Sequence, residues 1–462
     1  MKDIVNVDIL IAGGGSAGFG AAYTACLIGG RNYTVAVIDK NNILGGTSTA
    51  AGVTAWEMGI GGPGVHRELA CRLLALDNEA AILKGNWKPL LRTRPYAIAS
   101  PDDKYIYKDT LRAAGVHDRV NNHNSFIFEP RVMADEMLIM LSRAGGDNFT
   151  FYNNETIMSV KTADGKVSEV HTKKYVFKPK IIIDCTGDIT VARMTGCETE
   201  LGAGNSGRNI NGVTQVYRVE KKAYASIDIV PKKYCPPYKD KAFEKKLDNV
   251  RIISSINTYP NSDLNINPLP TMDGDEFFAM NREDALMICR GRVYLHWRRM
   301  QSDSPLMRNY KIKEIYTMIG IRESYRLKGE HILSADDVLS GFGEQNRRDE
   351  IIAFSDHPID IHGGVNPGLK ILDKPYGIPY GCILPQNISN MLVACRGSSF
   401  DSTAAASCRL SRTMISLGEA AGVAAVISLD SKKQPHDADV GKVRELLGLP
   451  AFTEKLSREY DL

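Results

Sequence analysis

The 462-residue sequence lacks the cysteine patterns that mark metal sites and redox dithiols. Its nine cysteines include no C-x-x-C pair and no accompanying histidine-rich segment, so we assign no metal ligand. An odd number of cysteines in a chain of this length fits a reducing compartment better than a disulfide framework. We therefore expect a cytoplasmic protein in which Cys395 and Cys408 are small packing residues.

The sequence also lacks a large excess of positive or negative charge, and it has few long hydrophobic runs. The chain has 57 Lys and Arg against 54 Asp and Glu, a net charge of +3, which is too weak to predict nucleic-acid binding. The apolar stretch 9–30 is crowded with glycine and follows Asp3 and Asp8, so it does not predict a membrane span. The composition is that of a globular protein, and the length suggests two or three domains.

Strand and helix patterns alternate at the start of the chain. Residues 7–12 form a short apolar run typical of a buried parallel strand, residues 16–28 predict a helix, and residues 33–38 predict a second strand. The helix carries small residues on one face, which allows close packing on a sheet: Ala17, Ala21 and Ala25. This is a βαβ unit whose two strands belong to one parallel sheet.

The pattern changes after residue 155. Residues 156–171 predict two strands joined by an Asp164-Gly165 turn, with a third short strand near Tyr175 that leads back into a separate buried strand at 181–183. Near the end of the chain, a buried strand at 391–394 precedes a helix at 411–428. That helix carries a stripe of small residues: Gly418, Ala421, Gly422 and Ala425.

These patterns predict an α/β protein in which a discontinuous first domain is interrupted by a second. We assign residues 1–205 and 372–435 to a Rossmann-like domain with a parallel sheet and a β-meander. Residues 206–371 form an inserted, mixed α+β substrate or cap domain, and residues 436–462 form a helical tail. The inserted domain carries a basic patch, interrupted by acidic residues and so expected to be a solvated surface: Lys232, Lys233, Lys239, Lys241, Lys245 and Lys246.

A glycine-rich turn joins the first strand to the first helix. Gly13 permits the tight turn, Gly15 lets a pyrophosphate reach the helix N-terminus, and Gly18 lets helix and sheet approach. Asp39 ends the second strand, where it can accept hydrogen bonds from ribose hydroxyls. In this strand-turn-helix-strand context, G-x-G-x-x-G with the acid in place predicts an adenine dinucleotide site, for either NAD or FAD.

Two later segments resemble those of FAD-binding proteins, and this resemblance favours FAD over NAD. Residues 44–52 (LGGTSTAAG) resemble the segment that passes the FAD phosphates and ribityl chain in fumarate-reductase-like flavoproteins. Residues 182–188 (IIDCTGD) resemble the second strand-turn of the glutathione-reductase-like FAD fold. The resemblance implies FAD, and fumarate-reductase-like proteins with covalent FAD use a histidine where this chain has Thr47, Ser48 and Thr49. We therefore expect non-covalent FAD, with His66 as the next histidine downstream.

Further motifs narrow the resemblance to a largely uncharacterised bacterial family of FAD-dependent oxidoreductases. They are GIRESYR at 320–326, HPIDIH at 357–362, the stretch from Leu384 to Arg396, SCR at 407–409 and GEAAG at 418–422. The chain departs from the family pattern in having Cys395 before the arginine where glycine is usual.

A second departure lies at Ser402-Thr403, where a His-Glu pair is common in the family. If that pair does chemistry in relatives, this chain lacks it. The fold and the resemblance together give these candidate cofactor-binding residues: Gly13, Gly15, Ser16, Ala17, Gly18, Asp39, Lys40, Gly45, Gly46, Thr47, Ser48, Gly52, Ile157, Thr186, Gly187, Asp188, Arg396 and Ser407.

Four residues are candidates for catalysis. An Arg322 fork suits a carboxylate or enolate-like oxygen, and Asp360 and His362 lie on one face of an extended segment. Arg409 can place a positive charge near the flavin, beside a helix N-terminus that Ser407 or Ser411 could cap. Arg326 is a further candidate for substrate binding. An alternative role for Arg322 is an interdomain salt bridge with Glu323.

The sequence therefore predicts an FAD-dependent oxidoreductase that exchanges a hydride between flavin N5 and a small polar substrate bearing a carboxylate or hydroxyl. The substrate is expected between the two domains, with an unidentified electron donor or acceptor completing the cycle. Two alternatives stay open: an RNA-modification or nucleic-acid-binding flavoprotein, supported only by the basic patch, and a flavin-binding protein without catalysis. No nucleic-acid partner and no membrane span are expected.

Overall fold

The computed structural model describes residues 2–57, 60, 64–76, 80–83, 125–202, 210–229, 231, 240–249, 255–268, 270–362 and 368–460. Of the basic patch, Lys232, Lys233 and Lys239 lie outside these ranges. The other three lysines are on helix α7 (Lys241–Asn249), where Lys246 pairs with Asp273 at 2.8 Å.

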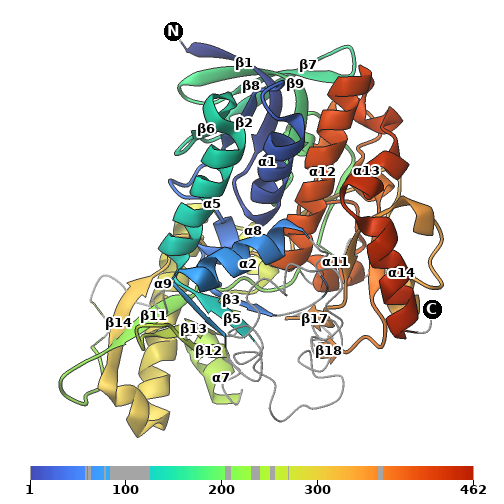
Figure 1. The fold of residues 1–462 in the computed structure, drawn as a ribbon. Helices are drawn as coiled ribbons and strands as arrows, with labels where there is room; N and C mark the ends of the chain where they lie inside the picture. The colour runs from blue at the N-terminus through green and yellow to red at the C-terminus, as the bar shows by residue number, and fades with distance from the viewer. Residues whose placement is uncertain are drawn as a thin grey trace.

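A seven-stranded sheet forms the centre of the first domain (Figure 1). Strand β1 (Asp3–Ala12) runs parallel to β2 (Val35–Ile38) on one side and to β9 (Tyr175–Asp184) on the other. The remaining strands are β6 (Phe149–Tyr152), beside β2, β20 (Met391–Val393), beside β9, and the antiparallel β8 (Lys166–His171) and β7 (Ser159–Ala163). The predicted parallel sheet with a meander is confirmed.

The strand predicted near Tyr175 and the buried strand predicted at 181–183 are one continuous strand, β9. Lys178 and Lys180 are exposed, whereas residues 181–184 are all buried. The outer half of the strand therefore alternates between buried and exposed residues, and the inner half does not. The Asp164-Gly165 turn lies where predicted, with φ of 52° and 68°, as two-residue hairpin turns require.

Helices α1 (Ser16–Gly29) and α12 (Ser411–Ser431) pack side by side on the sheet, as Figure 1 shows. A Cβ atom on Gly418 would lie 1.9 Å from the carbonyl oxygen of Ala17, and one on Gly422 would lie 2.4 Å from that of Ala21. The small-residue stripes of the two helices therefore face each other, and the contact joins an N-terminal and a C-terminal segment of the chain.

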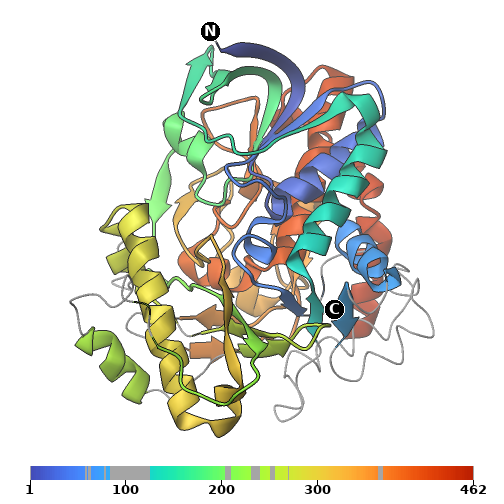
Figure 2. The ribbon, with the colours of Figure 1, turned by 90° about the vertical axis from the view of Figure 1, so that its left-hand side faces the viewer.

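A second sheet of four antiparallel strands lies apart from the first (Figure 2). Its order is β12 (Ser255–Thr258), β13 (Leu264–Asn267), β11 (Tyr217–Lys221) and β14 (Tyr310–Ile315). Helix α9 (Arg282–Asp303) covers one face, where Val293 and Trp297 pack against Tyr217 and Ile266. This is the mixed α+β segment that the composition predicts.

The chain then returns toward the first sheet and forms three small two-stranded sheets. Strand β15 (Tyr325–Leu327) pairs with β10 (Thr199–Leu201), β16 (Ile351–Ser355) pairs with β19 (Tyr376–Pro379), and β17 (Ile359–Ile361) pairs with β18 (Gly368–Lys370). Leu333, Ile352 and Ile359 share a hydrophobic core with residues of α1 and α12. The core of the first domain thus reaches into the segment that the sequence groups with the inserted domain, and the division at 372 stays a prediction.

The other described elements cover the edges. Strands β3 (Ala55–Glu57), β5 (Ser125–Phe128) and β4 (Ala81–Leu83) form a small sheet. The remaining helices are α2 (Val65–Ala75), α5 (Pro130–Gly145), α6 (Thr190–Met194), α8 (Gly274–Phe278), α10 (Ala335–Ser340), α11 (Ser402–Cys408), α13 (Val440–Leu446) and α14 (Leu449–Tyr460). The last two lie in the predicted helical tail.

One described helix, α12, is long and apolar enough to cross a membrane by length and composition. However, 89% of its most apolar window is buried inside the fold. This burial is that of a core helix, and its partner α1 supplies the apolar contacts.

Candidate functional site

A cavity of about 470 Å³ is lined by both parts of the molecule. Gly13, Asp39, Thr186 and Cys395 follow the carboxyl ends of β1, β2, β9 and β20, and these parallel strands end at one edge of the sheet, where ligands of such folds bind. The lining includes these predicted cofactor residues: Gly13, Gly15, Ser16, Ala17, Asp39, Lys40, Gly46, Thr47, Thr186, Gly187, Asp188 and Arg396.

The glycine turn before α1 has the shape of an anion-binding loop. Gly13 has φ of 99°, and a Cβ atom there would lie 2.6 Å from the carbonyl oxygen of Cys185. A Cβ atom on Gly18 would lie 1.8 Å from the carbonyl oxygen of Gly13, whereas one on Gly15 would meet no atom within 4 Å. The backbone is therefore packed behind the loop and open at Gly15, above the amides of the first helical turn.

Asp39 holds this loop. Its Oδ2 accepts a hydrogen bond from the Gly14 amide at 2.6 Å, and its Oδ1 accepts from the backbone and side-chain nitrogens of Asn41. Burial raises the pKa of the Asp39 carboxyl. Each carboxylate oxygen has two acceptor positions, so the group can still accept a bond from a ligand hydroxyl.

Residues 44–52 form the next part of the wall. The Gly45 amide donates to the carbonyl of Gly14 at 2.8 Å, and a Cβ atom on Gly46 would lie 3.0 Å from the Cα of Gly15. Gly52 has φ of 73° and lies against the ring of Tyr316. Gly18, Gly45, Ser48 and Gly52 thus do not line the cavity, but they shape the segments that do.

Arg396 closes the same end of the cavity. Its Nη2 donates to Asp188 at 2.5 Å, and a Cβ atom on Gly187 would lie 2.3 Å from its Nη1. Its Nε is buried and has no hydrogen-bond partner among the described residues. An unpartnered guanidinium nitrogen beside the α1 turn favours a bound anion.

The four predicted catalytic residues, Arg322, Asp360, His362 and Arg409, all line the other part of the cavity. Asp360 Oδ2 lies 2.6 Å from His362 Nε2 and 3.4 Å from Arg409 Nη2. Arg322 Nη1 donates to the carbonyl of Gly212 at 3.0 Å and to the Thr214 hydroxyl at 2.5 Å. The structure therefore brings the four residues, which lie in three separate stretches of the sequence, together.

The comparisons now identify the family. The family described as FAD dependent oxidoreductase matches residues 8–447, nearly the whole chain. The chain belongs to this family. It is thus an FAD-dependent oxidoreductase, and the family, the fold class and the cofactor class predicted from the sequence are confirmed.

Solved structures give distant matches to this FAD-dependent oxidoreductase. A geranylgeranyl bacteriochlorophyll reductase-like protein from Thermoplasma acidophilum is 11% identical, with a TM-score of 0.41, over 99% of this chain and 84% of that one. L-Proline dehydrogenase from P. horikoshii is 11% identical, with a TM-score of 0.42, over 93% and 94%. The myxobacterial chondrochloren halogenase is 12% identical, with a TM-score of 0.42, over 99% and 79%. No curated protein matches the sequence significantly.

The residues present in this FAD-dependent oxidoreductase fit FAD. The open Gly15 and the unpartnered Arg396 Nε suit a pyrophosphate, and the Asp39 carboxylate suits a ribose. Arg412 adds charge at the N-terminus of α12: its Nη2 pairs with Asp356 at 2.7 Å, while its Nε and Nη1 have no hydrogen-bond partner in the described part of the chain. Such a field would stabilise negative charge on a flavin bound at this end of α12.

Charges in the catalytic part of the oxidoreductase fix protonation states. Although burial alone raises it, the hydrogen bond from His362 and the charge of Arg409 hold the pKa of Asp360 well below its usual range. Burial lowers the pKa of His362 and outweighs its bond to Asp360. Burial and the nearby Arg409 lower the pKa of Arg322 to about 9. At neutral pH, Asp360 is ionised, His362 is neutral and Arg322 is charged.

Two cofactor predictions are wrong in their geometry. Ser407 does not cap the helix after the serine-rich turn: it belongs to α11, its hydroxyl donates to the carbonyl of His357, and it accepts from Tyr376 at 2.7 Å. Helix α12 begins after Leu410 without a side-chain cap, so Ser411 is not one either. Ile157 does not line the cavity and packs beside the core of the meander.

The predicted alternative pairing of Arg322 with Glu323 is also wrong. Glu323 is buried and accepts from the backbone and side-chain nitrogens of Asn211, from Arg326 at 3.0 Å and from Ser402. Arg326 is fully buried, donates to the carbonyls of Phe400 and Gly202, and does not line the cavity. Its role is structural, because its bonds join three segments of the chain.

Sequence reasoning missed several lining residues: Trp56, Ser255, Asn257, Asn265, Asn267, His357 and Arg412. The four on β12 and β13 had a readable pattern, because polar and apolar residues alternate in SINT and LNIN. Trp56 and Arg412 carried no such pattern, since their position depends on contacts between distant segments.

Proposed function

We propose that this oxidoreductase oxidises a hydroxyl-bearing carbon of a small polar substrate held between the first domain and the second sheet. The observation that carries the proposal is the pair formed by His362 and Asp360 at the cavity wall. When bound, FAD supplies the hydride acceptor at flavin N5. With FAD bound, the hydroxyl-bearing carbon would give up a hydride to the flavin, His362 would take the O–H proton, and a carbonyl product would remain.

The tautomer of His362 supports its role as a base. Ionised Asp360 can only accept hydrogen bonds, so His362 Nε2, at 2.6 Å, must carry a proton and donate it. Because the imidazole is neutral, its other nitrogen, Nδ1, is then an acceptor. A neutral imidazole held by a carboxylate suits removal of a hydroxyl proton.

Two arginines support the binding of an oxygen that gains negative charge. The hydrogen bonds of Arg322 to Gly212 and Thr214 both come from Nη1. The other N–H donors of its guanidinium can therefore bind a substrate oxygen. Arg409 is oriented by Asp360, and its Nε has no hydrogen-bond partner in the described ranges. Both guanidiniums would hold a carboxylate or a developing alkoxide beside His362.

The alternatives have weaker support. A nucleic-acid role rests on the basic patch, of which one described lysine is already paired with Asp273. Loss of catalysis rests on Ser402-Thr403, yet Ser402 bonds the buried Glu323, and a proton acceptor is supplied elsewhere by His362. An electron acceptor outside this chain would reoxidise the flavin.

We expect FAD to be bound without a covalent bond. Thr47 lines the cavity where a linking histidine would be needed, and the imidazole of His66 is buried with its ring 4.9 Å from that of Trp56. Burial lowers the pKa of His66 to about 3. Acid precipitation of the purified protein should release all of the flavin into solution, and flavin that stays with the polypeptide would contradict this expectation.

The decisive experiment is an anaerobic screen of hydroxylated, amino and carboxylic small molecules for flavin reduction, repeated on His362→Ala and Arg322→Ala. Both variants should keep their FAD spectrum and melting temperature but reduce the flavin about 10²-fold or more slowly, the usual scale for a positioned base. His171→Ala is the matched control, because His171 also pairs with a carboxylate two residues earlier on a strand, Glu169 at 2.8 Å, but does not line the cavity.

The pH profile separates a base from a structural residue. Since burial lowers the pKa of His362 below its usual 6.5, the wild-type rate should fall only as the pH drops below 6.5, and this limb should vanish in His362→Ala. Unchanged flavin reduction in a folded His362→Ala protein would remove His362 from the reaction. Loss of FAD and of thermal stability, with activity per bound flavin retained, would make its role structural.

A further inference from the structure

A row of uncharged polar side chains lines the cavity from the second sheet. We call it the amide wall, and it consists of Ser255 and Asn257 on β12 and Asn265 and Asn267 on β13. The alternate residues of β13, Leu264 and Ile266, pack in the core beneath α9. The period of two therefore gives this sheet one apolar face and one amide-rich face that borders the catalytic cavity.

One buried oxygen of the amide wall has no hydrogen-bond partner in the part of the chain that the structure describes, whereas the amide nitrogens of Asn257 and Asn265 are already engaged. Asn265 Nδ2 donates to the carbonyl of Gly52 at 2.8 Å and to the Tyr259 hydroxyl at 3.0 Å, so both of its hydrogens are engaged. The Oδ1 of Asn267 is buried without a hydrogen-bond partner among the described residues. Leaving such an oxygen unpaired costs about 1–3 kcal/mol, which a ligand donor would offset.

The chemistry of the wall selects hydroxyl groups. An amide and a hydroxyl each offer both donors and acceptors, whereas a carboxylate only accepts and suits the arginines instead. An ammonium group would meet Arg322, Arg409 and Arg412 in the same cavity, and the Asp360 carboxylate is already engaged by His362 and, at 3.4 Å, by Arg409. An apolar group would leave the amides unpaired.

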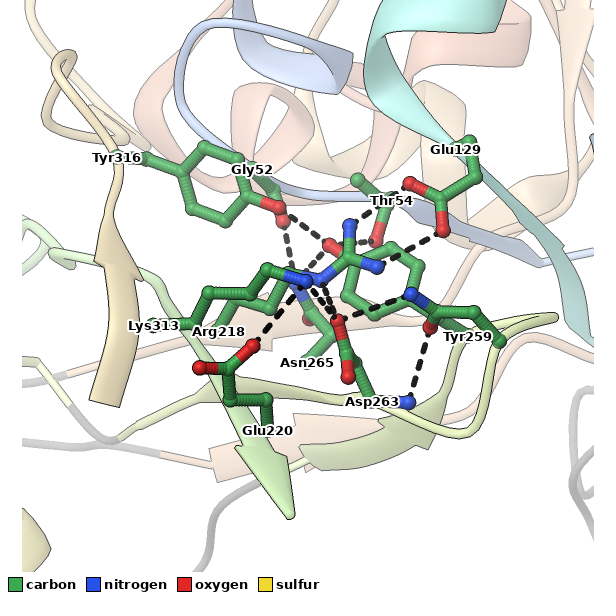
Figure 3. A network of polar contacts seen from close by, with 11 residues as sticks. Gly52, Thr54, Glu129, Arg218, Glu220, Tyr259, Asp263, Asn265, Lys313 and Tyr316 are labelled. Carbon is green, nitrogen blue, oxygen red and sulfur yellow. Dashed lines mark hydrogen bonds and ion pairs between the residues drawn. The ribbon is translucent and has the colours of Figure 1, made fainter. Parts of the chain in front are cut away.

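One member of the wall, Asn265, is also held by a network of polar contacts (Figure 3). The Tyr259 hydroxyl lies 2.5 Å from that of Tyr316, and it accepts from Thr54 and Asn265. Arg218 stacks over the Tyr259 ring at 3.9 Å. A network of this kind fixes Asn265 before any ligand arrives, which favours specific recognition.

We propose that the substrate is a polyhydroxylated, carbohydrate-type molecule. One hydroxyl-bearing carbon reacts beside His362 while neighbouring hydroxyls bind the amide wall. This inference rests on the proposed oxidation for the reacting hydroxyl, but the binding of the other hydroxyls depends only on the amide wall.

The test is anaerobic titration of the FAD-loaded enzyme with aldoses, alditols and aldonates of four to six carbons, against L-lactate and L-alanine. Polyhydroxylated compounds should perturb or reduce the flavin spectrum where L-lactate and L-alanine do so weakly or not at all. Asn257→Leu and Asn267→Leu should raise KM for them about 10-fold or more, with a smaller change in kcat, because each loses hydrogen bonds to the substrate. Asn267→Asp, which keeps the shape and an acceptor oxygen, should recover most of this affinity.

Thr258→Val is the matched control, since Thr258 is on β12 but exposed and outside the cavity lining; its KM should equal that of the wild type. Spectral perturbation by sugars that depends on Asn267, without flavin reduction, would support the substrate class and overturn the proposed oxidation. Flavin reduction by L-lactate that depends on His362, with no response to any polyhydroxylated compound, would support the proposed oxidation and overturn the substrate class. Wild-type KM in folded Asn257→Leu and Asn267→Leu proteins would also overturn the inference.

Discussion

Asp39 combines two tasks in one side chain, because its carboxylate holds the Gly14 amide and faces the cavity. Asp39→Asn keeps an acceptor for that amide but loses the charge. We expect FAD affinity to fall about 10-fold to 100-fold, the range for hydrogen bonds to a charged group, and Asp39→Arg to remove the flavin. Fluorescence titration of the apoprotein with FAD measures this.

Asp8→Asn, on the neighbouring strand β1 and paired with Lys180 at 2.7 Å, is the control and should bind FAD like the wild type. Equal affinity in Asp39→Asn would show that the carboxylate contributes only to the shape of the loop.

Glu419 predicts how stability depends on pH. It is buried in α12, accepts from the Val65 amide at 2.9 Å, and burial raises its pKa to about 7 from an ordinary 4.5. A raised carboxyl pKa contributes stability that is present below pH 4.5 and is lost as the pH rises through 7. Glu419→Gln should therefore be more stable than the wild type at pH 8, by up to roughly 3 kcal/mol, and the advantage should vanish near pH 4.5.

Melting temperatures between pH 4.5 and pH 8 test this dependence on Glu419. Glu445→Gln, at an exposed position of α13, should follow the wild-type curve throughout. If Glu419→Gln ran parallel to the wild type over the whole range, the carboxyl would not be the group that titrates.

Single residues were predictable from the sequence where chemistry and a local motif coincided. Asp360 and His362 share a face of one extended segment, and the structure pairs them. Ser407 was misplaced because the turn contains a short extra helix, α11, before α12. Arg326 resembled Arg322 in sequence context, and only the tertiary bonds of the two side chains distinguish them.

The contact of α1 with α12 predicts a large effect from one methyl group. A Cβ atom on Gly418 would lie 1.9 Å from the Ala17 carbonyl, so Gly418→Ala must push α1 away from α12. Because α1 also presents the Gly15 turn, we expect Gly418→Ala to lower the melting temperature and the flavin content together. Overpacking of this kind costs about 1–3 kcal/mol.

Gly441→Ala is the matched control, since Gly441 lies in helix α13 and a Cβ atom there would meet only the Asp439 side chain at 3.2 Å. Alanine favours a helix, so this variant should be at least as stable as the wild type. A Gly418→Ala protein with normal flavin content would separate helix packing from cofactor binding.

Helices and strands were predicted well where one pattern ran through the whole element. The boundaries of α1 agree to within one residue, because a glycine turn and Gly29-Gly30 flank it. Strand β9 was divided in two, since its outer half pairs in the meander and alternates in burial while its inner half is buried on both faces. A change of environment along a single strand cannot be read from local sequence.

The two parts of the molecule are joined by a buried ion-pair network, shown in Figure 3. Arg218 on β11 bonds both oxygens of Glu129, at the start of α5, and Asp263 at 2.7 Å. Arg218→Met would remove the cation that pairs with the partly buried Glu129, and it would leave Asp263 with Lys313, at 2.9 Å, in place of two cations. We expect a loss of about 3–5 kcal/mol in unfolding free energy, measured by urea denaturation, with FAD still bound to the folded protein.

Arg299→Met provides the comparison for Arg218→Met, because Arg299 pairs with Asp303 at the surface of α9; such a pair contributes no more than about 1 kcal/mol. If the two variants lost equal stability, the Arg218 network would not hold the parts together.

The sequence prediction that both ends of the chain contribute to one domain came from one strand-helix pair at each end, and the structure places β1 and β20 in one sheet. What the sequence did not show is the cavity between the sheets: the amide wall belongs to a segment with no motif, and it borders the site only because β11 to β14 fold back over it. The hydrophobic core around α1 and α12 also includes residues after 325, such as Ile352. These contacts join distant segments, so no local sequence pattern predicts them.

The pairing of α1 with α12 also sets an order of events during synthesis. Ala17 and Gly418 are 401 residues apart in the chain, so at ~5–20 residues per second the ribosome needs roughly 20 to 80 s to produce the second after the first. During that interval, the nascent chain carries a small-residue helix face whose partner does not yet exist. The cofactor loop of the earliest-made segment can therefore reach its final form only when the last strand of the sheet and α12 have emerged.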